Sequence, residues 1–364
     1  FFVIFAITIM KFNYCFLKKR FLLLLIALGI GSVLYANNEL KLLTDSLRRV
    51  IDEKHVFVKE KEDRINRIKC MLRSPGLTLE YRINLRLYNE YKKFHIDSAI
   101  HYVDRNIEIS RQLNRPYFTN QSSLHLSLLY SMCGRFREAE IILKSIKTSE
   151  LPRDLLINYY QTYSSFWGHY SISVANNLYG KQQAAYQDSL FALIDHTSWD
   201  YRMSQASYYI WRDTLKSKEI YKELLEIEEV GTPNYAMITH SYSRLCHHQK
   251  KYDEEKKYLM LSAIADTRNA TRENASLQSL ALIAYDEQNL ADAFKFTQSA
   301  IDDVISSGIH FRAIEIYKFN SIINTAYQAE QARSRSHLTT FLISTSIILF
   351  LLVLLVLFIY IQMK

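Results

Sequence analysis

The sequence has few residues that break helices. It contains 8 Gly and 4 Pro in 364 residues, whereas Tyr occurs 26 times. Folds rich in β-sheet need frequent turns, and those turns draw on Gly and Pro. The scarcity of both residues, with long stretches in which apolar residues recur at helical spacing, predicts an all-α fold with short connections.

Cysteine is also scarce. The chain has four: Cys15, Cys70, Cys133 and Cys246. An exported protein held together by disulfides usually has a denser and even-numbered set. The three cysteines after residue 36 lie far apart in helical contexts, so we expect single buried thiols.

Excess positive charge is nearly absent from the central part of the chain. Five of the eight excess charges belong to residues near the two ends, which leaves +3 for residues 37–337. The five are Lys11, Lys18, Lys19, Arg20 and Lys364. A nucleic-acid-binding domain concentrates basic residues on one face, so this distribution argues against nucleic acid as a partner.

Catalytic and metal-binding motifs are missing as well. The sequence has no Gly-rich phosphate loop, nucleophile elbow or His-Glu-x-x-His, and we expect neither an enzyme nor a cofactor. Cys246, His247 and His248 are adjacent, so on a helix they point about 100° apart and do not converge on one metal ion. His240, Arg244 and His248 share a helix face, which we interpret as ordinary surface.

The N-terminus has the sequence features of a secretory signal peptide. From Met10, basic residues precede the apolar run 21–30, and Ala36 stands before polar Asn37. Cleavage after Ala36 is the simpler prediction, and an uncleaved anchor is the alternative, because Leu34 is large for its position. Residues 1–36 are therefore assigned to upstream residues and a signal peptide.

A long amphipathic helix follows, in the segment 37–76. Its apolar residues have near-helical spacing as far as residue 73, and Ser74-Pro75-Gly76 should end it. It is either a dimerising coiled coil, giving a homodimer, or a capping helix packed on the next helix pair. Lys54 and Lys61 interrupt the apolar seam and favour the capping helix.

The central region contains a repeat. A bulky apolar residue is followed three positions later by a slot that is small in the clearest copies. The slots lie 40, 79, 37 and 38 residues apart, and the longest interval can hold two periods. Such a period predicts stacked helix-turn-helix units, an α-solenoid. The pairs are Ile96/Ala99, Phe136/Ala139, Leu215/Lys218, Tyr252/Glu255 and Leu290/Ala293.

This pattern resembles the tetratricopeptide repeat, and we assign residues 77–330 to a tetratricopeptide-like domain. In that family the small residue lets the two helices of a unit approach closely. The match is best around Gly134, Phe136 and Ala139. Lys218 and Glu255 depart from it, so their units should pack more loosely.

Two stretches, 262–294 and 88–102, resemble a closer family of unknown function found in Gram-negative gut anaerobes. Its members are similar in layout: an exported tetratricopeptide-like region, one membrane span, then a cytoplasmic coiled coil and a helical output region. The resemblance implies a membrane-bound sensor or transcription-regulator-like protein. It also implies that the present sequence is a fragment without the output region.

Two candidate partner-binding patches stand out. The segment 158–186 is rich in aromatic rings and interrupts the repeat period, which is typical either of a recognition surface or of a helical core. The segment 266–274 concentrates charges, as a recognition patch or as a turn between two helices. The candidate residues are Tyr159, Tyr163, Phe166, Trp167 and Tyr170 in the first, and Asp266, Arg268, Arg272 and Glu273 in the second.

The segment 338–362 is predicted to span a membrane. It has no charged residue and is long enough to cross a hydrocarbon core of about 30 Å. With an exported N-terminus, the repeats would face the periplasm and Lys364 the cytosol, in the inner membrane. Flanking charges support this weakly, since Arg333 and Arg335 precede the span.

These features favour a tethered periplasmic receptor domain that binds a protein or peptide ligand. A structural scaffold or adaptor for an envelope assembly is the alternative, from a different class of function. Both agree with an all-α tetratricopeptide-like solenoid carrying a signal peptide and one C-terminal transmembrane helix.

Overall fold

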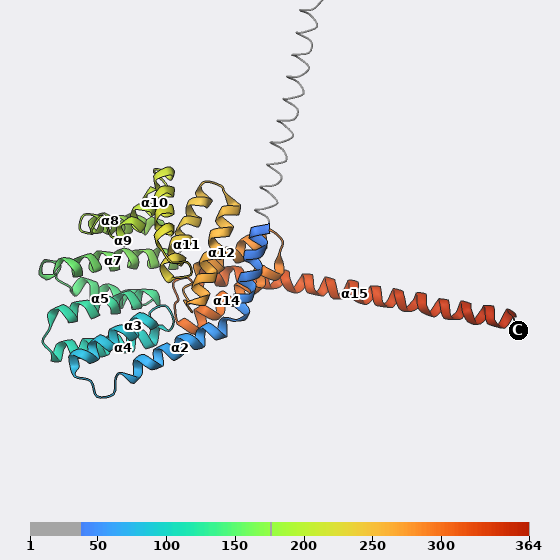
Figure 1. Cartoon of the computed structure of the whole chain (residues 1–364), viewed down its shortest axis with the longest axis horizontal. Helices are drawn as coiled ribbons and strands as arrows, with labels where there is room; N and C mark the ends of the chain where they lie inside the picture. Colours follow the sequence, from blue (N-terminus) through green and yellow to red (C-terminus); the bar gives the residue numbers. More distant parts are fainter. Residues whose placement is uncertain (1–37, 175–176, 364) are drawn as a thin grey trace, which may run out of the picture.

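The computed structural model describes residues 38–174 and 177–363, and this part of the chain is built from helices. The predicted signal peptide lies outside the described residues. Residues 38–52 are helical and are followed by α2 (Lys54–Cys70). Six helix pairs come next, and α15 (Ala313–Met363) ends the described chain (Figure 1). The prediction of an all-α fold is confirmed.

The pairs are formed by successive helices that pack against each other, as tetratricopeptide-like units do. The 79-residue interval between predicted slots holds the additional pair α7/α8, as two periods require. The pairs are α3 (Leu77–Tyr91) with α4 (Ile96–Gln112), α5 (Pro116–Met132) with α6 (Phe136–Ser145), α7 (Arg153–Ser173) with α8 (Gly180–Phe191), α9 (Trp199–Tyr209) with α10 (Thr214–Ile227), α11 (Pro233–His248) with α12 (Tyr252–Arg268), and α13 (Ala275–Asp286) with α14 (Leu290–Ser307).

The small-residue slots are the fourth residues of the second helices. Ala99, Ala139 and Ala293 are completely buried there. The carbonyl oxygen of Ala139 accepts a hydrogen bond from the Ser127 hydroxyl of α5, at 3.0 Å. A hydroxyl can reach that carbonyl only where the two helices are close, so the slot has the packing role that the repeat pattern predicts.

One repeat register was wrong by a residue. In α10 the fourth residue is Ser217, which is completely buried and donates to the Ala206 carbonyl at 2.8 Å. Lys218 is only half-buried, and Leu215 is 72% exposed. The true pair is Thr214/Ser217, so this unit keeps a small residue in its slot and needs no loosened packing.

The N-terminal helices cap the far end of the solenoid rather than the next pair alone. Leu47 and Val50 are buried among residues of α12, α13 and α14. Arg48 binds the carboxylate of Asp292 at 2.7 Å, and Lys54 binds that of Asp303 at 2.7 Å. Figure 1 shows this blue segment lying along the orange C-terminal pairs. The capping interpretation is therefore right: α2 packs on α3 of the next pair, as predicted, and residues 38–52 in addition cap the end of the repeat array.

The predicted single helix over 37–76 is also interrupted. A turn at Glu53 separates residues 38–52 from α2, and α2 ends at Cys70, before Ser74. Lys61 does not point into solvent. It is 8% exposed and donates to the Asn269 carbonyl at 3.3 Å. Both lysines that break the apolar pattern thus contact the C-terminal repeats.

A second set of contacts joins the early and late repeats. The Arg272 backbone N–H donates to the Lys93 carbonyl at 2.8 Å, and its side chain stacks on Phe94 at 4.0 Å. The backbone N–H of His310 donates to the Met132 carbonyl, at 2.9 Å. The turn between α12 and α13 and the connection between α14 and α15 therefore pack against the first two helix pairs.

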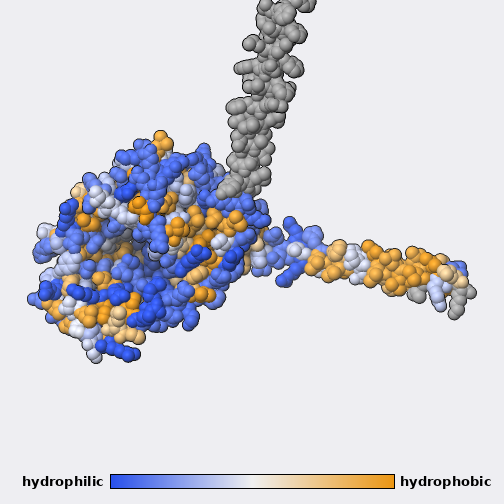
Figure 2. All heavy atoms as spheres, in the orientation of Figure 1, coloured by the Kyte–Doolittle hydropathy of each residue, from blue (hydrophilic) through white to orange (hydrophobic). Residues whose placement is uncertain are grey.

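Helix α15 begins inside the fold and then leaves it. Ile316 and Ile323 are buried against α13 and α14, and Tyr327 stacks on Phe294 at 4.3 Å. Beyond this point the helix projects from the body, and Figure 2 shows an apolar surface along its outer part. The segment Phe319–Met363 is long and apolar enough to cross a membrane. The domain boundary expected at residue 330 falls within this one helix.

The three cysteines among the described residues are free thiols in different environments. Cys246 is buried, and burial together with Glu254 raises its pKa to about 12. Cys133 is half-buried, and Cys70 is exposed, so the expectation of buried thiols was wrong for Cys70. Cys246 therefore remains a protonated, unreactive thiol at neutral pH.

Candidate functional site

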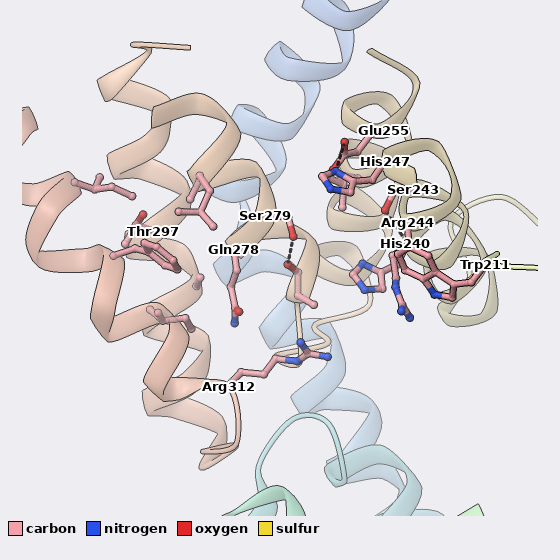
Figure 3. Close-up of a pocket in the computed structure, with 18 residues that line it drawn as sticks. Trp211, His240, Ser243, Arg244, His247, Glu255, Gln278, Ser279, Thr297 and Arg312 are labelled. Carbon is pink, nitrogen blue, oxygen red and sulfur yellow. Dashed lines mark hydrogen bonds and ion pairs between the residues drawn. The ribbon is translucent and has the colours of Figure 1, made fainter. Parts of the chain in front are cut away.

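A cavity of about 510 Å³ lies between the last two helix pairs and the root of α15 (Figure 3). Its apolar wall includes Leu259 from α12, Leu282 from α13, and three residues of α15: Ile316, Phe319 and Ile323. Cavities of this size suit small organic ligands. The same helix that is long enough to cross a membrane therefore lines the cavity with its first turns.

The polar wall is made by side chains from three separate elements. His240 and Arg244 come from α11, Gln278 from α13, and Arg312 from the connection before α15. Trp211, in the turn between α9 and α10, closes one side and lies edge-on to His248 at 4.5 Å. Figure 3 shows the polar groups around one open space, with Arg312 reaching toward the side where His240 and Arg244 lie.

His240 is neutral at physiological pH. Burial lowers its pKa to about 4, and the charges of Arg312 and Arg244 act in the same direction. Its Nδ1 shares a hydrogen bond with the Ser276 hydroxyl at 3.1 Å. The imidazole is thus a fixed neutral group beside two permanent cations.

Arg312 carries an unsatisfied donor. Its Nε is buried and has no hydrogen-bond partner among the described residues. The guanidinium lies over the Phe311 ring at 4.9 Å. Buried donors in proteins are nearly always paired, so this N–H has unused binding capacity.

A cluster of ionisable groups adjoins the cavity. Lys93 and Glu273 form an ion pair at 3.3 Å. Burial acts to raise the pKa of Glu273, but Lys93 and Arg312 outweigh it and hold that pKa below its ordinary value. Burial raises the pKa of Asp266 to about 8. One carboxyl is therefore ionised and its neighbour is largely protonated at neutral pH.

His169 of α7 completes this cluster. Its Nδ1 shares a hydrogen bond with the Ser131 hydroxyl at 2.9 Å, and its ring packs on Phe311 at 4.2 Å. Burial lowers its pKa to about 4. Helices from the second and third pairs thus contact the same connection, residues 308–312, that supplies Arg312 to the cavity.

The structure places the predicted charged segment 266–274 at this centre. Asp266 and Glu273 belong to the ionisable cluster, and Arg272 donates to the carbonyls of Phe94 and Ser306, both at 3.0 Å. Arg268 is exposed and stands apart. Arg272 therefore has a structural contact between repeats, while a role for the four residues in partner binding stays a prediction.

The aromatic segment lies elsewhere, in the packing of α7 against α6 and α8. Tyr163 and Phe166 are 4% and 3% exposed, and Tyr163 stacks on Tyr186 at 4.4 Å. Of the two alternatives, the helical core holds for these two rings, since Tyr163 packs on Tyr186 of α8 and Phe166 on Phe136 of α6. Tyr159, Trp167 and Tyr170 are half-buried, and their role in partner binding stays a prediction.

Sequence reasoning missed most of the cavity. Arg244 is exposed, as the surface assignment expected, but His240 is half-buried and both line the cavity, while Gln278, Arg312 and Trp211 were not singled out. The helix face shared by His240 and Arg244 was a usable signal, since their side chains do point into one space. The third side chain, Arg312, is 68 residues beyond Arg244, and no local pattern connects the two.

A family model described as the SusR N-terminal TPR domain matches residues 51–318. The chain belongs to this family. The SusR-type TPR domain covers α2, all six helix pairs and the first residues of α15, so the cavity lies within it except for Phe319 and Ile323. No curated protein matches the chain significantly. TPR domains generally mediate protein–protein interaction, and this domain has the helix-pair architecture of an interaction module.

Proposed function

We propose that the chain is a membrane-tethered sensor domain of a signalling or transcription-regulator-like receptor, with its repeats in the periplasm. One observation carries this proposal: the cavity and the candidate span share a helix. A bound ligand would contact α15 directly at Ile316 and Phe319, and α15 continues without interruption to Met363.

The proposed signal is a change at the root of α15. A ligand shifts a conformational equilibrium only by its difference in affinity for the two states. Arg312, Ile316 and Phe319 lie on the moving side of such a change, whereas Gln278 and Arg244 lie on the repeat body. A ligand that bridges both sets would favour one position of α15 over others.

The proposed topology follows from the ends of the helical body. The signal-peptide pattern at 10–36 predicts export, and the uncharged segment 338–363 predicts that the exported chain stays anchored in the inner membrane. A reporter enzyme that is active only outside the cytosol should be active when fused after residue 337 and silent when fused after Lys364. The reverse pattern would contradict the periplasmic placement.

The experiment that tests the sensor role uses the chromosomal gene. Gln278→Trp would fill the cavity from its half-buried wall, and Glu219→Trp on the exposed face of α10 is the matched control. For a sensor, gene deletion and Gln278→Trp should each change a restricted set of transcripts, and the control should not. If transcripts stay constant while an envelope complex is lost on deletion, the scaffold function replaces the sensor.

A further inference from the structure

We infer that the cavity selects ligands with a carboxylate on an apolar body, and that Arg312 and Arg244 receive the carboxylate. The inference rests on the proposed function insofar as it treats this cavity as the recognition site. It adds the chemical class of the ligand, which the family assignment leaves open.

The first argument is the buried Nε–H of Arg312. It has no partner among residues 38–174 and 177–363, although it is shielded from water. A guanidinium offers its N–H groups as a planar fork that fits the two oxygens of a carboxylate. No acceptor among the described residues holds this edge of the fork, and Figure 3 shows the guanidinium reaching into the open space, where its terminal N–H groups would meet a ligand carboxylate.

The second argument is that the nearby acids are already engaged. Glu255, in the cavity wall, has its carboxylate 3.0 Å from Nδ1 of His247, which is its polar partner. Glu273 is bound to Lys93 at 3.3 Å. Arg244 has no ion pair with the described residues, and His240 adds no charge because its pKa is lowered to about 4. The region between Arg244 and Arg312 is therefore positive when empty.

The third argument concerns the rest of the lining. Trp211, Leu259, Leu282, Ile316 and Phe319 provide a wall on which an aromatic or branched aliphatic body would be buried. A small hydrated anion would leave this wall uncovered. An apolar acid satisfies both parts of the cavity, either as a free organic acid or as the C-terminus of a short apolar peptide.

Binding to the full chain in detergent micelles tests the inference. The probes are 4-phenylbutyrate and the tripeptide Leu-Leu-Phe with a free C-terminus, each compared with its uncharged primary amide by isothermal titration calorimetry. We expect at least one acid to bind more than about tenfold more tightly than its amide. The acid that does so identifies the source of the carboxylate.

The variants separate the two arginines from general charge. Arg312→Gln and Arg244→Gln should each weaken binding of that acid by about tenfold or more, whereas Arg82→Gln, on the exposed face of α3, should not. Arg312→Lys keeps the charge without the planar fork and should fall between. Helicity and thermal midpoint, measured for each variant, identify any variant that fails to fold.

Three results would overturn the inference. These are equal binding of acids and amides, full affinity in a folded Arg312→Gln variant, and no binding of either acid up to about 10 mM. If Gln278→Trp still alters transcripts, the sensor proposal remains valid after any of these three results. Conversely, acid binding without any transcript change would leave the ligand class standing and remove the sensor role.

Discussion

At the scale of single residues, the molecule places ionisable groups where water is scarce. Asp266 lies in the last turn of α12 and Glu273 just before α13, yet burial raises the pKa of the first and nearby cations hold that of the second down. Sequence could identify the charged turn as unusual. It could not assign the two protonation states, because Lys93, which pairs with Glu273, comes from the first helix pair.

The titration of Asp266 predicts a pH dependence of stability. Its pKa is about 8 in the folded chain, against an ordinary 3.8, so between these values the folded state holds a proton that the unfolded chain releases. Stability therefore falls as pH rises through this range. His169 and His240, with pKa values lowered to about 4, oppose the trend only below their ordinary 6.5.

We expect the free energy of unfolding to decline between pH 6.5 and 8 by up to about 2 kcal/mol, since one proton contributes about 1.36 kcal/mol per pH unit. Asp266→Asn should abolish most of this decline. The exposed Asp286→Asn should leave it unchanged. Urea unfolding at several pH values measures the slope, and an unaltered slope in Asp266→Asn would show that another group causes it.

A second residue-scale prediction concerns the aromatic cluster. Tyr163→Ala removes a ring stacked on Tyr186 and packed beside Phe166, so it should destabilise the fold by about 3–5 kcal/mol. Tyr252→Ala, at a ring that is 61% exposed, should change stability by less than about 1 kcal/mol. If Tyr163→Ala unfolds at the same denaturant concentration as the wild type, the ring is not part of the core.

At the scale of helices, the repeat pattern could be predicted well because it depends on short-range spacing. The slots at Ala99, Ala139 and Ala293 follow directly from the sequence, since one bulky and one small residue mark each second helix. The α10 register failed because Leu215 is apolar but points to solvent, so hydrophobicity alone selected the wrong residue. The α7/α8 unit escaped detection because Gln183 stands in its slot.

That unit makes room for Gln183 by a glycine in the facing helix. A Cβ on Gly168 of α7 would lie 3.1 Å from the Gln183 amide nitrogen. The small residue is therefore in the first helix rather than the second. A search for a small residue in the second helix of each unit therefore misses this unit, because its small residue is in the first helix.

The corrected α10 register gives the element-scale prediction. Ser217→Leu should overpack the contact with α9 and destabilise by about 1–3 kcal/mol, because Ser217 is completely buried and donates to the Ala206 carbonyl. Lys218→Leu, one residue later, should stay within about 0.5 kcal/mol of wild type. Thermal or urea unfolding compares the two, and equal effects would return the register to Lys218.

At the scale of the whole molecule, the repeat array is fastened to its own N-terminal helices. This arrangement could not be predicted, because contacts such as Arg48–Asp292 join residues about 240 positions apart, and the lysines that make others were visible only as interruptions of the apolar seam. Lys54 is hydrogen-bonded to the Ser299 carbonyl at 3.0 Å besides its ion pair with Asp303. The cap therefore depends on a charged side chain in a place where an apolar seam was expected.

The Lys54–Asp303 pair provides the prediction at this scale. Asp303 is only 4% exposed as a side chain, so Lys54→Met leaves a buried carboxylate without its cation and should cost about 3–5 kcal/mol at pH 8. Lys295→Met, which breaks a more exposed pair with Asp52, should cost less than about 1 kcal/mol. The double variant Lys54→Met with Asp303→Leu should recover much of the loss.

The same fastening constrains how the protein is made. An open repeat array can fold progressively, each unit packing on the one before it as it emerges. Here the helix that holds Leu47 and Val50 is synthesised first, but its apolar face can pack against α12–α14 only after more than 200 further residues have followed. During that interval the nascent chain carries an unshielded hydrophobic helix, a species prone to aggregation. We therefore expect chains that stall before α12 to be ready substrates for chaperones and proteases, whereas the finished chain is not.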